Sequence, residues 1–267
     1  MIAITRAVSP RIVECELTCH DREPIDAARA SAQHERYEQW LDRHGARIVR
    51  ADPAPEHPDG VFVEDAAVVL DEIAIITRPG AESRRGETDS VARLLHDYRP
   101  LHRIEEPATI DGGDVLTIGR SIFVGQSTRT NDLAVEQLRE IVTPHGYEVT
   151  AVPLRECLHL KSAATAVGDG TLLVNPRCVD RESFPGLEVI AVPETEPGAA
   201  NVLCLAGALL ISSSYPETRR MLQHRGLAVE TIDYQELEKA EAGVTCCSIL
   251  FRGPSPGREE APPVTPE

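Results

Sequence analysis

The feature that most constrains the fold of this chain is a repeated ending. In three places a predicted helix closes at a glycine and a β-rich segment follows at once. The three copies read WLDRHGARIVRAD, EIVTPHGYEVTAVP and MLQHRGLAVETID. Glycine is favoured just after the last helical turn, because the left-handed backbone needed there is costly for a residue with a Cβ atom. Each copy therefore predicts a helix that stops and leads directly into a strand.

Two adjacent strand-like segments precede the helix, so the repeated unit is strand, strand, helix, strand. Four such units follow one another along the chain. Their paired strand segments are 61–70 with 73–79, 111–119 with 121–127, 162–168 with 171–175, and 201–207 with 208–214. Their helices are expected near 86–98, 131–142, 178–184 and 216–225.

The first unit lacks one strand. It offers a strand at 2–9, a helix at 25–44 and a strand over ARIVRAD, while 243–252 has strand composition and no partner of its own. We therefore predict an α/β fold, a five-bladed propeller of ββαβ repeats whose ring is closed by the C-terminal strand, as repeats of about 50 residues can form. An open α/β sheet is the alternative, since the same alternation supports it.

Composition narrows the functional classes. The chain has 43 acidic and 27 basic residues, a net charge of −16, which would repel a phosphate backbone. It has no run of 18 uncharged apolar residues and no signal peptide at its start. We therefore expect no nucleic-acid partner, no membrane, a cytoplasmic location and a small cationic substrate. A single domain is expected over residues 1–252, and the proline-rich segment 253–267 is expected to be a disordered tail.

The seven cysteines also favour a reducing compartment, where most thiols act as small buried hydrophobes. Cys15, Cys19 and His20 resemble half of a zinc site, but no second pair has matching spacing. We therefore expect no metal there.

Polar residues inside strand-like apolar segments are the candidates for chemistry, because a buried charge without a partner is costly. They are Glu64 and Asp65, Asp111 and Asp114, His159, and Cys246 and Cys247, with the basic Arg84, Arg85 and Arg129 beside them. Taken singly, each has a structural alternative: a turn cap for Asp114, a core histidine, solvated arginines, an inert packed thiol. Taken together, Cys, His and Asp supply a nucleophile, an acid/base and an orienting group at equivalent places in three units. Clustered carboxylates suit a planar guanidinium.

Six motifs in sequence order give the chain a family resemblance. They are FVED, ITRPGAESRR, DGGDVL, VGxSxRTN, LHLKSA and a near-terminal TCCS. Together they resemble the dimethylarginine dimethylaminohydrolase family of the guanidine-modifying pentein superfamily, over residues 2–252. The resemblance implies an α/β-propeller of five ββαβ units about a pseudo-fivefold axis.

The resemblance also implies catalytic roles. Cys246 resembles the nucleophile, His159 the general acid/base, and Asp111 the acid that orients the imidazole. The family nucleophile directly follows Thr, and strand alternation predicts that Cys247 points away from the site.

Seven further residues resemble substrate-binding positions. Asp65, with Glu64 beside it, would hold the guanidinium, and Asp59, Arg84 and Arg129 would hold the amino-acid end, the arginines pairing with its carboxylate. Backbone contacts are implied at Ile12 and Ala240, where alanine is smaller than the branched residue expected.

The activity implied is hydrolysis of Nω-methylated L-arginine to L-citrulline and an alkylamine through a covalent Cys thiouronium intermediate, with no metal or organic cofactor. Arginine deiminase is an alternative, although the chain is short for it, and so is an amidinotransferase. A non-catalytic arginine-binding protein is an alternative from another class. A homodimer is a candidate assembly that the sequence does not decide.

Overall fold

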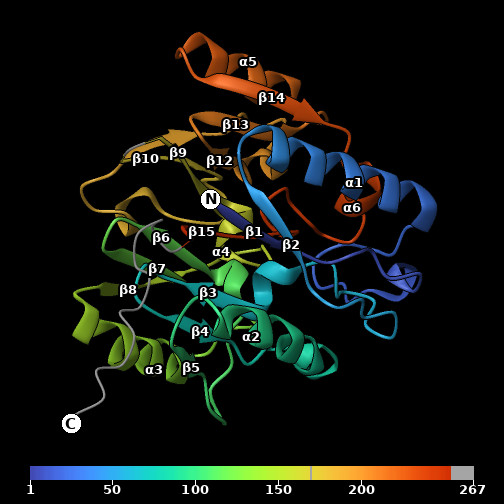
Figure 1. Cartoon of the computed structure of the whole chain (residues 1–267). Coiled ribbons are helices and arrows are strands. Elements are labelled where there is room, and N and C mark those ends of the chain that lie inside the picture. Colours follow the sequence, from blue (N-terminus) through green and yellow to red (C-terminus); the bar gives the residue numbers. More distant parts are fainter. Residues whose placement is uncertain (169, 254–267) are drawn as a thin grey trace, which may run out of the picture.

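Five small β-sheets of three strands each organise the chain (Figure 1). This computed structural model describes residues 1–168 and 170–253. In every sheet the middle strand has one antiparallel and one parallel neighbour. A parallel neighbour requires a crossover connection, which is usually a helix. Each sheet with its crossover is therefore one ββαβ unit, and the predicted mixed α/β fold is confirmed.

The first sheet joins the two ends of the described chain. Its order is β15 (Ile249–Phe251), β1 (Ile2–Thr5) and β2 (Arg47–Arg50). Ile2 lies opposite Phe251 in the antiparallel pair, and Figure 1 shows both strands near the middle of the molecule. Helix α1 (Ala27–Arg43) forms the crossover, and the Asp26 side chain caps its first turn. The strand missing from the first unit is thus supplied from near the C-terminus, as predicted.

The other four sheets follow chain order. Their strands are β3 (Ala67–Val69), β4 (Ala74–Ile76) and β5 (Leu101–Arg103); β6 (Val115–Ile118), β7 (Ser121–Gln126) and β8 (Glu148–Pro153); β9 (Ala164–Gly168), β10 (Thr171–Val174) and β11 (Glu188–Ala191); β12 (Leu203–Leu205), β13 (Ala208–Ser212) and β14 (Ala228–Ile232). Their crossovers contain α2 (Thr88–His96), α3 (Asp132–Val142), the 3-10 turn Arg181–Ser183, and α5 (Pro216–His224). Two short helices, α4 (Leu160–Ala163) and α6 (Gln235–Glu238), lie outside this pattern.

Several predicted strands are too long at their polar ends. The segment Val63–Ala66 is a 3-10 turn, so Glu64 and Asp65 precede strand β3 instead of lying within it. The stretch 243–248 is also a turn, in which the Cys246 amide donates to the Gly243 carbonyl at 3.1 Å. Local backbone hydrogen bonds of this kind replace the ladder bonds that a strand would need. The prediction that these polar residues lie inside strands is therefore wrong.

Hydrophobic clusters join neighbouring units. One cluster contains Ile2 and Ile249 of the first sheet with Ile76 of the second. Three others join the second unit to the third, the third to the fourth and the fourth to the fifth. The largest contains Leu210 of the fifth sheet with Trp40 of α1. Successive sheets therefore bury apolar side chains against one another.

Two sequence-based expectations concern regions of the chain rather than single elements. The predicted tail lies, from residue 254 onward, outside the described residues. Within the described residues, no helix combines the length and the apolar character that a membrane crossing requires.

The short strand β15 offers a test of this architecture. Phe251 is buried, and its ring packs edge-on at 5.3 Å from the Tyr98 ring. We expect Phe251→Ala to lower the free energy of unfolding by about 3–5 kcal/mol, because truncating a buried aromatic leaves a cavity. Leu133→Ala is the control, since Leu133 is 46% exposed and should change stability by less than about 0.5 kcal/mol. Urea unfolding measures both, and equal small effects would contradict a closing role for β15.

Candidate active site

Polar segments precede the first strand of every unit. The turn Val63–Ala66 precedes β3, the turn Gly112–Asp114 precedes β6, and His159 with α4 precedes β9. Asn201 precedes β12, and the turn 243–248 precedes β15. The first two turns contact each other, and α4 contacts the second. The repeat therefore gathers these segments in one region. The sequence had indicated equivalent positions in the units only for the cysteine, the histidine and the aspartate.

His159 lies between two carboxylates. Its Nε2 is 3.0 Å from Asp111 Oδ2, and its Nδ1 is 3.9 Å from Asp65 Oδ1. Burial lowers the pKa of the imidazole, but the charge of Asp65 and the hydrogen bond to Asp111 outweigh burial and raise this pKa to about 9. Near neutral pH the ring therefore carries a proton that it can give away.

Asp111 is fixed on several sides. Its Oδ1 accepts a hydrogen bond from the Gly80 amide at 2.9 Å, and its own amide donates to Thr130 Oγ1 at 3.3 Å. Asp111 is fully buried. The carboxylate is thus held in one position, which suits the predicted role of orienting the imidazole.

The glycine pair of DGGD is required by close packing. A Cβ atom on Gly113 would lie 2.7 Å from His159 Nδ1 and 2.9 Å from Asp65 Oδ1. A Cβ atom on Gly112 would lie 2.0 Å from the Glu64 carbonyl oxygen. These glycines let the histidine and the two acidic segments approach one another.

Asp65 lies between two buried positive side chains, Arg84 and His159. Its Oδ2 accepts from Arg84 Nη1 at 2.7 Å, and its Oδ1 accepts from the Gly113 amide at 2.9 Å. Burial raises the pKa of this carboxyl, but the positive charges of His159 and Arg84 outweigh burial and lower it to about 2. Asp65 is therefore ionised at neutral pH although it is buried.

Arg84 has partners within the protein. Besides Asp65, it pairs with Glu87 at 3.0 Å and donates to the backbone carbonyl of Phe62 at 3.2 Å. The residue is 4% exposed. The Arg84 guanidinium is thus paired with Asp65 and Glu87. Its contact with a substrate carboxylate stays a prediction.

Arg129 and Asp59 both contact the segment 16–20. Arg129 Nη2 donates to Thr18 Oγ1 at 2.9 Å, and Arg129 Nη1 lies 3.8 Å from Asp111 Oδ2. The Asp59 carboxylate accepts from the Glu16 amide at 3.1 Å, and burial raises the pKa of Asp59 to about 6. Arg129 therefore connects Asp111 to the segment 16–20, and Asp59 contacts the same segment.

Ile12 and Ala240 lie in the largest hydrophobic cluster with buried side chains. The Ile12 carbonyl accepts from the Cys15 amide at 3.1 Å, and the Ala240 amide donates to the Leu237 carbonyl at 3.0 Å. Their backbone contacts with a substrate stay predictions.

Glu64 bridges residues that sequence reasoning missed. Its Oε1 accepts from Lys161 Nζ at 2.8 Å, and its Oε2 accepts from Thr245 Oγ1 at 2.8 Å. The Glu64 amide also donates to the Cys246 carbonyl at 3.1 Å, and Asn201 Oδ1 accepts from the Thr245 amide at 3.0 Å. Glu64 therefore holds the turn that carries the thiol. The sequence signal that could have identified Lys161 as a site residue is its charge within LHLKSA, beside an apolar strand.

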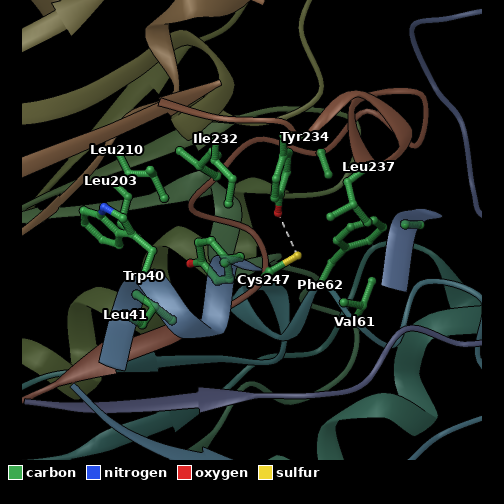
Figure 2. Packing of buried hydrophobic residues seen from close by; sticks show 14 of the residues in the cluster. Trp40, Leu41, Val61, Phe62, Leu203, Leu210, Ile232, Tyr234, Leu237 and Cys247 are labelled. Atoms are coloured by element: carbon green, nitrogen blue, oxygen red, sulfur yellow. Dashed lines mark hydrogen bonds between the residues drawn. The ribbon is translucent and has the colours of Figure 1, made fainter. Parts of the chain in front are cut away.

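The two adjacent thiols have different surroundings. Cys246 is partly exposed, and its sulfur accepts from the Gly243 amide at 3.4 Å. Burial and the negative charges of Glu64 and Asp65 raise the pKa of the Cys246 thiol well above its usual range. Cys247 is fully buried, and its sulfur accepts a hydrogen bond from the Tyr234 hydroxyl at 2.8 Å. Figure 2 shows the two side chains pointing toward each other. The predicted separation of the thiols is present, but a turn produces it and not strand alternation.

One group of side chains within the described residues could hold a metal ion by distance. Asp65, Asp111 and His159 offer ligand atoms that lie within 4.8 Å of one another. Both carboxylates already accept hydrogen bonds, Asp65 from Arg84 and Asp111 from the Gly80 amide. The raised pKa of His159 also disfavours the neutral imidazole that a metal needs. The arrangement suits proton transfer better than metal binding.

Covalent catalysis by cysteine uses the thiol as nucleophile and a histidine as proton donor and acceptor. Here Glu64 connects the thiol-bearing turn to Lys161, two residues after His159, and Asp65 lies beside the imidazole. The five-unit α/β fold and this site together suit an enzyme that uses a cysteine and a histidine in covalent catalysis.

Comparisons with known proteins narrow this class. A family model for "N,N dimethylarginine dimethylhydrolase, eukaryotic" matches residues 15–185. The chain is 43% identical to an N(G),N(G)-dimethylarginine dimethylaminohydrolase of Streptomyces coelicolor, over 94% of this chain and 96% of the relative. It is 34% identical to the enzyme of that name from Pseudomonas aeruginosa, over 93% and 98%. A solved structure of the Pseudomonas aeruginosa protein with citrulline has a TM-score of 0.89 at 33% identity, over 93% of this chain and 98% of that one. The chain belongs to the dimethylarginine dimethylaminohydrolase family.

The environments of the two thiols lead to a mutational test. We expect Cys246→Ser to abolish turnover, because a hydroxyl is a far weaker nucleophile than a thiolate. Cys247→Ser should keep most of the activity, since Cys247 contacts Tyr234 in the core. Steady-state citrulline production measures both variants. Comparable losses would contradict the assignment of Cys246 as the nucleophile.

The raised pKa of His159 leads to a second test. We expect kcat/KM to fall as the pH rises through about 9, because the imidazole then loses the proton that the leaving amine needs. Asp65→Asn removes a negative charge beside the ring, so it should lower this pKa and move the alkaline limb to lower pH. Asp42→Asn, at an exposed position, is the matched control and should leave the limb in place. An NMR titration of His159 in each variant checks the shift; an unchanged pKa in Asp65→Asn would refute the coupling.

Proposed function

We propose that this protein hydrolyses Nω-methylated L-arginine to L-citrulline and an alkylamine. The observation that carries the proposal is His159, held 3.0 Å from Asp111 and beside Asp65, in the region of the turn that presents Cys246. Family relatives named for this activity, and the relative bound to citrulline, support it. The substrate is then a small cationic amino acid, as the charge of −16 favours.

The electrostatics suggest how attack begins. The Cys246 thiol is protonated in the free protein because its pKa is raised. A bound guanidinium brings a positive charge, which favours the thiolate, and the thiol proton passes to water. The substrate thus helps to activate its own nucleophile.

The covalent steps then divide between the thiol and the imidazole. The Cys246 sulfur forms a bond to the guanidinium carbon, the carbon–nitrogen bond to the alkylamine breaks, and His159 gives its proton to the departing nitrogen. A thiouronium remains on Cys246. Neutral His159 next removes a proton from water that attacks the same carbon, and the sulfur leaves as citrulline forms.

The remaining roles follow from the contacts. Asp111 orients the imidazole, and Asp65 keeps it protonated while facing the guanidinium. Glu64 acts beside Asp65 by holding the thiol-bearing turn, and Asp59 and Arg129 face the amino-acid end. Arg84 acts on Asp65 through the ion pair at 2.7 Å.

We further infer the finer architecture. The five units form one closed α/β-propeller over residues 1–252, supported by the β15–β1 pairing and by the clusters that join successive units. We propose the cytoplasm as the location, since an odd number of cysteines, seven, suits a reducing compartment. A homodimer is the proposed assembly, which analytical ultracentrifugation would test.

A substrate panel tests the proposed function. Dimethylarginine, monomethylarginine and arginine are compared by kcat/KM, with citrulline and the released amine both measured and Cys246→Ser as the control. We expect the methylated forms to be preferred. Faster ammonia release from arginine would favour a deiminase, and transfer to an amine acceptor would favour an amidinotransferase. Binding without turnover would indicate an arginine-binding protein.

The different partners of the two arginines predict different substrate effects. Arg129→Ala should lower kcat/KM for methylarginine by roughly 10- to 150-fold, the cost of one charge-assisted contact. The same variant should lower kcat/KM much less for an alkylguanidine that lacks the α-carboxylate. Arg84→Ala should harm both substrates alike, because it leaves Asp65 and Glu87 without their shared cation. Equal losses from Arg129→Ala on both substrates would contradict its carboxylate role.

A further inference from the structure

A cavity of about 300 Å³ adjoins the segment that carries His159. Three thiols are among its lining residues: Cys157 and Cys178, with Cys19 at its exposed side. The proposed reaction uses none of them. Two of these thiols, Cys157 and Cys178, also pack in the same hydrophobic cluster.

Cys157 and Cys178 are held in contact by their own segments. The Cys157 thiol donates a hydrogen bond to the His159 carbonyl at 3.6 Å, and Cys157 and Cys178 lie close enough for each to shift the pKa of the other. Asn175 Nδ2 also donates to the Cys178 sulfur, at 3.2 Å. The Arg155 amide donates to the Cys178 carbonyl at 3.0 Å, so the backbone segments run side by side. This pair is therefore built into the packing of the fourth unit.

The charges around the pair distinguish its two members. The neighbouring Cys157 lowers the pKa of the Cys178 thiol despite burial, with help from the positive charges of Arg155 and Arg177. The neighbouring Cys178 and, after it, burial raise the pKa of the Cys157 thiol. The thiolate character thus lies on Cys178 and the proton on Cys157. A thiolate beside a second thiol is the arrangement of a redox-sensitive cysteine with its resolving partner.

We propose that Cys157 and Cys178 are an oxidation site that a peroxide closes to a disulfide. The Cys178 sulfur attacks one peroxide oxygen, the oxygen–oxygen bond breaks, and the leaving oxygen takes a proton from solvent and departs as water, which gives a sulfenic acid. The Cys157 sulfur then attacks the Cys178 sulfur, and the sulfenic oxygen leaves as water with the Cys157 proton. Two thiols lose two electrons, and the peroxide gains them.

The disulfide acts on the position of His159. Cys157 lies two residues before His159, and its sulfur is 3.6 Å from the His159 carbonyl oxygen. Glu156, between Arg155 and Cys157, already has a left-handed backbone with φ of 50°. A disulfide holds its sulfurs at about 2.05 Å, closer than two unbonded sulfur atoms can approach, so its formation must shift this segment. The link from this shift to activity rests on the proposed function of His159.

Peptide mapping of the full chain tests the oxidation site itself. The Cys246→Ser variant removes the proposed nucleophile, and it is treated with limiting hydrogen peroxide, alkylated under denaturing conditions and digested with trypsin. Cleavage at arginine and lysine places Cys157 in peptide 156–161 and Cys178 in peptide 178–181. We expect these two peptides to be joined, with a loss of two hydrogens, and dithiothreitol to separate them. A bond from either cysteine to Cys19, or oxidation elsewhere with this pair intact, would overturn the proposal.

A second measurement tests the effect on His159 without any turnover. In the same Cys246→Ser background, the NMR signal of the His159 ring should move on oxidation and return on reduction. Adding Cys178→Ser should abolish the movement, while Cys19→Ser, at the same cavity, should preserve it. A linked pair with an unmoved His159 signal would refute the coupling. Because neither measurement needs an active enzyme, failure of this proposal is distinguishable from failure of the proposed function.

The kinetic consequence completes the test. In proteins that keep Cys246, we measure the activity that peroxide removes and dithiothreitol restores. This reversible loss should be at least about tenfold smaller in Cys178→Ser than in the unaltered chain. Cys178→Ser should have the normal activity before oxidation, since Asn175 and Arg155, which donate hydrogen bonds to Cys178, take no part in the proposed reaction. Equal reversible losses in the two proteins would contradict control by this pair.

Discussion

The ion pair between Asp65 and Arg84 is the interaction on which the candidate site depends. Both side chains are almost fully buried, and their closest atoms are 2.7 Å apart. Buried charges are costly unless they are paired and hydrogen-bonded, and removing one partner typically destabilises by about 3–5 kcal/mol. Here Glu87 balances Arg84 on its other side, and the Gly113 amide satisfies the second Asp65 oxygen. The pair can therefore persist in the interior and present a fixed negative charge to His159.

This fixed charge links the chemistry of the site to its stability. The pKa of Asp65 is lowered from 3.8 to about 2, so its contribution is present above about pH 3.8 and is lost as the pH falls through 2. The pKa of His159 is raised from 6.5 to about 9, so its contribution is present below about pH 6.5 and is lost as the pH rises through 9. Between these limits the buried charges favour the folded state, and the imidazole keeps the proton that catalysis would use.

The turns before the first strands explain why the site tolerates so many polar groups. A residue inside a ladder has its backbone committed to neighbouring strands, whereas a turn residue leaves its amide or carbonyl free for other segments. The Glu64 amide reaches the Cys246 carbonyl, and the Gly113 amide reaches Asp65. Each unit thus contributes a polar turn followed directly by a strand. The same construction brings the Cys157 segment beside Cys178 in the fourth unit.

The sequence alone determined the repeat, the order of its elements and the residue types of the site. Glycine stops and strand pairs are local signals, and the motifs around Asp111, His159 and Cys246 are contiguous. Partners distant in sequence were decided by the tertiary structure. Arg84 pairs with Asp65 and Glu87, which no local motif indicated, and its contact with a substrate carboxylate stays a prediction. Lys161 and Asn201 were missed because their partners, Glu64 and Thr245, lie in other units. The physical reason is that a buried charge or amide takes whichever partner the packed units bring within hydrogen-bonding distance, and no local pattern records that choice.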